Sequence, residues 1–180
     1  MVAKLENEYD VEIDWKPFYL RPDTPPEGMD LPDYVKRAQA SGADKRLQEM
    51  AQQNGLDFVP TKRLHNTRLA HEAHAYAAEN GQGKAFHHAV FQKIYGQGLD
   101  ISDWQVLRQA ASEAGLDPDD MQRTVDGGKY TQLVMEEVQL ASQIGVTGVP
   151  TYVINDRYAV VGAQPYEVFK NALKKILPGP

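Results

Sequence analysis

The step Val149-Pro150-Thr151 constrains the fold of this chain more than any other stretch. Proline has no backbone N–H and cannot donate to the middle of a β-sheet, yet the apolar run Tyr152 to Ile154 follows almost at once. The pattern predicts a tight turn that ends at Pro150 and a buried strand directly after it. An ordinary trans proline at the start of a strand is the commoner case. The alternative is a cis bond, found at about 5–6% of X–Pro bonds in folded proteins.

A β-hairpin and a helix are predicted after this proline. Strands over 151–154 and 158–161 flank Asn155-Asp156-Arg157, and asparagine and aspartate suit such turns. Pro165 then begins a final helix, which we expect to end near Leu177.

The preceding part of the chain is predicted to contain one strand and a long helical stretch. Val11 to Trp15 alternates apolar and polar residues, which is typical of a half-buried strand. From Leu31 to Val138 the apolar spacing is mostly helical, interrupted by glycine and proline. We therefore expect an α/β fold in which residues 1–30 and 139–180 form one domain and residues 31–138 form a helical insertion. The helices expected there cover 33–54 with a break near Ser41-Gly42, 68–79, 86–95, 102–114, 117–125 and 129–144, the last with Leu133, Val138 and Ala141 among its buried residues.

Composition excludes several classes of function. The chain has no cysteine, so these 180 residues hold no disulfide, thiolate ligand or thiol nucleophile. A net charge of −6 disfavours a general nucleic-acid binder, and no apolar run approaches the roughly 20 residues that a membrane span needs. The first ten residues contain no signal-peptide core, so a cytoplasmic location is expected.

The remaining candidates for chemistry are interpreted as structural. His71 and His74 lie three residues apart, one short of the His-Glu-x-x-His spacing of zinc proteases, and the sequence identifies no third ligand. Glu136 and Glu137 are adjacent and diverge on a helix, which disfavours a catalytic carboxylate pair. We therefore expect no metal site, no cofactor and no catalytic residue.

Several ordered segments resemble the DsbA-like thioredoxin-fold family, and its FrnE-type branch most of all. GVTGVPTYVINDRYAVVGAQPYEVF (145–169) resembles the C-terminal half of that family, and VEIDWKPFYLRPDTPPEG (11–28) resembles its segment after the first helix. HNTRLAHEAHAYAAENG (65–81) resembles its inserted helical subdomain. The resemblance implies a DsbA-type thioredoxin-like sheet with a large inserted α-helical subdomain. It also implies a cis bond before Pro150, with Val149, Pro150 and Thr151 as the substrate-binding wall.

The resemblance also implies that a strand and a motif are missing. The family begins with a strand and a Cys-x-x-Cys at the start of its first helix, whereas residues 1–10 correspond only to the end of that helix. Without this N-terminal strand, the neighbouring strands would keep unpaired ladder groups. We expect an upstream start that was lost or mis-assigned, a strand donated by another chain, direct pairing of the remaining strands, or a homodimer through the incomplete sheet.

Three functions remain open on this basis. The first is a member of the thiol–disulfide oxidoreductase family, truncated or degenerate, that is redox-inactive as written because nothing replaces the thiols. The second is a non-catalytic module that binds an extended peptide or protein. The third is a relative of glutathione-dependent isomerases or transferases, although no serine precedes residue 11 to match their active-site serine.

Overall fold

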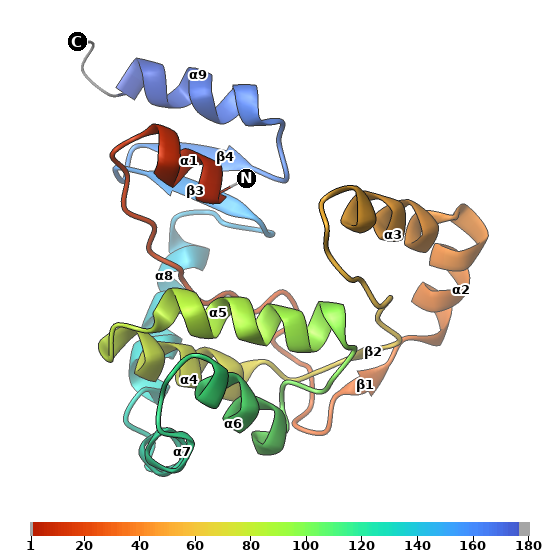
Figure 1. Cartoon of the computed structure of the whole chain (residues 1–180), viewed down its shortest axis with the longest axis vertical. Helices are drawn as coiled ribbons and strands as arrows, with labels where there is room; N and C mark the ends of the chain where they lie inside the picture. The colour runs from red at the N-terminus through yellow and green to blue at the C-terminus, as the bar shows by residue number, and fades with distance from the viewer. Residues whose placement is uncertain (1, 177–180) are drawn as a thin grey trace. The chain divides into compact units, whose positions relative to one another are not determined.

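The computed structural model describes residues 2–176, and the chain folds into two compact units (Figure 1). The first unit comprises residues 1–20 and 136–180, and the second comprises residues 21–135. These units are defined by contacts in space. The insertion of residues 31–138 into a sheet domain, with the boundaries expected above, stays a prediction.

The first unit is built on a β-hairpin with the predicted bounds. Strand β3 (Thr151–Ile154) pairs antiparallel with β4 (Tyr158–Val161), which confirms both strands. Asn155 and Asp156 turn the chain between them with φ of 50° and 53°, in the left-handed region that these two residue types tolerate better than most. The turn chemistry inferred from the sequence therefore forms this hairpin.

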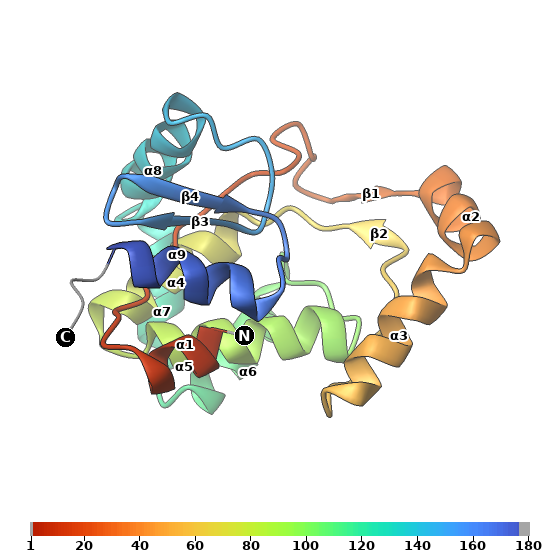
Figure 2. The same ribbon diagram turned by 90° about the horizontal axis from the view of Figure 1, so that it is seen from above.

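Two helices cover one face of the hairpin, α1 (Val2–Glu8) and α9 (Tyr166–Ile176) (Figures 1 and 2). Leu5 of α1 and Phe169 of α9 are buried against Val160 of β4. The Tyr152 ring of β3 meets the Phe169 ring edge-on, with centroids 4.7 Å apart. One face of the hairpin thus forms the core of this unit.

The strand predicted over Val11–Trp15 is wrong, because this segment has no regular secondary structure. The exposure of its side chains still alternates, with Val11, Ile13 and Trp15 half-buried and the residues between them exposed. An extended segment becomes a strand only when a neighbour accepts its ladder hydrogen bonds. Among the described residues no strand pairs with this one, and β3 and β4 form a sheet of their own.

The second unit is a bundle of α4 (Arg68–Glu79), α5 (Gly83–Phe91), a π-helical turn (Gln92–Gly96), α6 (Trp104–Glu113) and α7 (Pro118–Asp126). Its core is contiguous, with Phe86, Leu107 and Met121 fully buried. Two of these helices begin at an aspartate cap. The side chains of Asp103 and Asp117 accept backbone N–H groups of the first turns of α6 and α7.

The second unit also contains a small two-stranded sheet that the sequence did not predict. Strands β1 (Met29–Asp30) and β2 (Arg63–Leu64) pair antiparallel, and α2 (Pro32–Ser41) and α3 (Ala43–Gln53) lie between them in sequence. Gly42, with φ of 67°, separates the two helices at the predicted break. Two-residue strands carry no periodicity that a sequence pattern could reveal.

Helix α8 (Thr131–Gln143) spans the point at which the chain passes from the second unit to the first. The prediction that Leu133 is buried is wrong, because 44% of that side chain is exposed while Val134 is 1% exposed. Tyr130 and Val134, one helical turn apart, face the core instead. Across residues 2–176, no helix combines the length and the apolar character needed to cross a bilayer.

Candidate functional site

The predicted substrate-binding residues lie together at the start of β3. The Val149–Pro150 peptide bond is cis. The hydroxyl of Thr151 donates to the carbonyl of Gly148 at 2.7 Å, and the N–H of Gly162 donates to the carbonyl of Pro150 at 2.8 Å. These two hydrogen bonds fix the turn against the hairpin. Val149 lies on the surface and is 56% exposed.

The register of the hairpin determines which backbone N–H and C=O groups of β3 form hydrogen bonds with β4. Because the carbonyl of Pro150 binds Gly162 and that of Ile154 binds Arg157, the alternate residues 150, 152 and 154 face β4. The N–H and C=O groups of Thr151 and Val153 therefore point to the opposite edge. Within residues 2–176, β4 is the sole strand paired with β3, so this outer edge of β3 has free donors and acceptors.

The face of the hairpin that turns away from α1 and α9 is apolar and accessible. Val153 of β3 and Val161 of β4 are 45% and 61% exposed. Strand β3 carries no charged residue and no proline within its span, so it lacks the devices that commonly protect a strand edge. The outer edge of β3 can accordingly accept another strand.

A cationic depression lies at the far end of the same hairpin. Asn155, Arg157 and Tyr158 of the turn line it together with Lys175 and Ile176 at the end of α9, and its volume is about 320 Å³. Among the residues that the structure describes, no acidic residue lines it. The sequence analysis missed Val153, Arg157 and Lys175 as site residues. The sequence marks them by position alone. Val153 lies on β3 with its backbone groups directed away from β4, Arg157 lies in the turn, and Lys175 lies in the last turn of α9.

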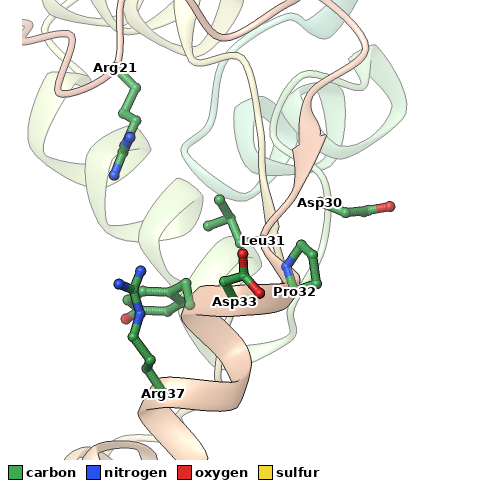
Figure 3. A pocket seen from close by; sticks show the side chains of 7 residues that line it. Arg21, Asp30, Leu31, Pro32, Asp33 and Arg37 are labelled. Atoms are coloured by element: carbon green, nitrogen blue, oxygen red, sulfur yellow. The ribbon is translucent and has the colours of Figure 1, made fainter.

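A second depression, in the helical unit, is less suited to an anion (Figure 3). Arg21 and Arg37 line it, and Figure 3 shows both guanidinium groups directed toward it. Asp33 of α2 lies in the same lining and supplies a counter-charge. Asp30 points away in Figure 3 and pairs with Arg63 at 2.7 Å.

The histidines lie in the helical unit, where His65 Nδ1 lies 2.9 Å from Asp100 Oδ1 and the rings of His74 and His87 make aromatic contacts. The His87 ring stacks on Phe91 with centroids 4.3 Å apart and meets His74 edge-on at 6.0 Å. Burial, with smaller contributions from His74 and His88, lowers the pKa of His87 to about 4. No cluster of three or more histidines, aspartates and glutamates placed to hold a metal ion occurs in residues 2–176.

Comparison with known proteins points to one family. A family model described as "DSBA-like thioredoxin domain" matches residues 1–174. The chain is 29% identical over 167 residues to the uncharacterized protein YwbO of Bacillus subtilis (strain 168), a match that covers 91% of this chain and 82% of that protein. It is 31% identical over 72 residues to the thiol:disulfide interchange protein DsbA of Pseudomonas syringae pv. tomato, covering 40% of this chain and 34% of DsbA.

Two solved structures are similar over most of the chain. A probable DsbA oxidoreductase from Streptomyces coelicolor has a TM-score of 0.78 and 27% sequence identity, covering 89% of this chain and 73% of that chain. A 2-hydroxychromene-2-carboxylate isomerase has a TM-score of 0.77 at 18% identity, covering 97% of this chain and 86% of the isomerase. At that identity, the isomerase shows similarity of fold alone.

Proposed function

Because this chain belongs to the DSBA-like thioredoxin domain family, we propose that its 180 residues bind an extended polypeptide and do not themselves exchange disulfides. The binding site of this proposal is the outer edge of β3 with the adjoining residues Val149, Pro150 and Thr151.

The observation that carries the proposal is that the outward backbone groups of Thr151 and Val153 meet no partner strand among the described residues. Thr151 and Val153 each present one N–H and one C=O away from β4, and an extended peptide can satisfy all four groups by adding a strand. Val149 and Val153 are about half exposed and supply apolar contact beside those groups. Main-chain hydrogen bonds would provide affinity, and these side chains would select apolar residues in the ligand.

The absence of cysteine supports the second half of the proposal. Thiol–disulfide exchange begins with attack by a thiolate, and this sequence contains none. We expect dithiothreitol to reduce insulin disulfides at the same background rate with and without the purified chain. A rate clearly above background would contradict this part of the proposal.

Peptides with selectively methylated backbones test the binding site. An added strand pairs through the N–H groups of one of its two edges, so N-methylation of every residue, which blocks both edges, should abolish binding, whereas N-methylation of alternate residues leaves one edge able to pair. Fluorescence anisotropy of labelled, cysteine-free peptides with alternating valine and threonine measures both. Undiminished binding by the fully methylated peptide would exclude strand addition.

Finer assignments belong to the same proposal. Membership of the FrnE-type branch rests on the quoted segments. A cytoplasmic location agrees with a chain that has no cysteine to oxidise, and cell fractionation checks it. The glutathione-dependent isomerase alternative stays a prediction, and calorimetric titration with glutathione tests it directly.

A further inference from the structure

We propose that the polypeptide bound at β3 carries an acidic side chain, and that this side chain binds Arg157 and Lys175 in the depression at the end of the hairpin. This inference rests on the proposed function and specifies the chemical class of its ligand.

The lining of the depression favours a carboxylate. Arg157 and Lys175 contribute two positive charges, and neither has an ion pair among the described residues. The amide of Asn155 and the hydroxyl of Tyr158 are further donors in the same lining. Hydrogen bonds from charged donors to a carboxylate are shorter and stronger than neutral ones.

The macrodipole of α9 does not account for this arrangement. A lysine in the last turn of a helix is ordinarily explained by the partial negative charge of the helix C-terminus, and Lys174 and Lys175 both fit that description. Arg157 lies in the β-turn, outside any helix, and nevertheless faces the same depression. Two cations from separate elements thus line one depression, and none of the other described residues in its lining is acidic.

The depression lies within reach of a strand added to β3. The outward positions of β3 are Thr151 and Val153, and the turn residue Asn155, which follows the end of β3, lines the depression. A strand advances about 3.3 Å per residue, so a ligand residue beside Asn155 lies roughly 7 Å beyond one beside Val153. A ligand that extends past Ile154 by one or two residues would therefore bring an acidic side chain to Arg157.

Two capped peptides with the same alternating middle test the inference. One carries glutamates at both ends and the other carries glutamines, and both are acetylated and amidated so that no terminal charge contributes. We expect the wild-type chain to bind the glutamate peptide about tenfold more tightly at low salt, as expected for one charge-assisted contact. Anisotropy titrations supply both dissociation constants.

The protein variants complete the design. Arg157→Gln with Lys175→Gln should bring the ratio of the two constants to about one, chiefly by weakening binding of the glutamate peptide. Lys174→Gln, at a neighbouring lysine that does not line the depression, should keep the tenfold ratio. Circular dichroism checks that each variant is folded.

The other possible results contradict either the acidic-ligand inference alone or the proposed function as well. Equal binding of both peptides by the wild-type chain, or a ratio that the double variant does not reduce, would remove the acidic-ligand inference and leave the proposed function standing. Failure of both peptides to bind would remove the proposed function, and this inference with it.

Discussion

Glu72 is a carboxylate with 1% of its surface exposed, inside the helical unit. Its Oε1 accepts a hydrogen bond from Arg68 at 2.9 Å and one from the Thr131 hydroxyl at 3.2 Å. Arg68→Met would leave a buried charge without its cation, so we expect the free energy of unfolding to fall by about 2 kcal/mol, below the loss for a fully buried pair because Arg68 is half exposed. Urea denaturation measures this loss. Adding Glu72→Met should recover much of it, and a single variant as stable as wild type would refute the expectation.

The pKa of His87, about 4, predicts how this residue contributes to acid stability. An unfolded histidine titrates near 6.5, so the unfolded state binds the proton first and the contribution of His87 is complete above about pH 6.5. That contribution is lost as the pH falls from 6.5 toward 4. His87→Phe keeps an aromatic ring on Phe91 but cannot titrate, so its free energy of unfolding should fall less between pH 7 and pH 5. A His87 pKa near 6.5 by NMR would contradict this.

At the scale of elements, the sequence predicted what local chemistry determines. Helix α4 was predicted with its observed bounds, and α6 and α7 lie within about two residues of their predicted bounds, because a cap and a periodic apolar face act over a few residues. Val11–Trp15 has the pattern of a strand, but a partner strand decides whether that pattern becomes one. The sequence pattern drew attention to Val149-Pro150-Thr151, which are neighbours in the chain. It did not predict the cationic depression, because Arg157 and Lys175 come together only in the folded chain.

The turn between β3 and β4 supplies a prediction at the same scale. Asp156 has φ of 53°, a conformation that costs β-branched residues most and glycine nothing. We expect Asp156→Val to lower the free energy of unfolding by roughly 1–2 kcal/mol, and Asp156→Gly to change it by less than about 0.5 kcal/mol. Urea denaturation compares the two variants. Equal losses would mean that the turn conformation does not limit the stability of the hairpin.

At the scale of the whole molecule, the thioredoxin-like fold inferred from the sequence is confirmed, while the described part of its sheet is a single hairpin. The homodimer expected from the sequence becomes a sharper prediction, since the same outward groups of Thr151 and Val153 that would bind a peptide can pair with a second copy. Sedimentation equilibrium should show an average mass that rises with protein concentration, and the peptide with alternating valine and threonine should reverse the rise by competition.

Two charge variants locate that association. In an antiparallel pair of β3 edges, Val153→Lys would add two like charges at the interface, so we expect the dimer to weaken by about tenfold or more. Ala159→Lys places the same charge opposite Val153 on β4, on the same face but away from the β3 edge, and should have a smaller effect. A mass independent of concentration would exclude the dimer. Equal weakening by both variants would assign the association to the exposed apolar face. In a contact through the β3 edge, a charge on β3 lies at the interface and a charge on β4 lies one strand farther away, so the two variants must differ in effect.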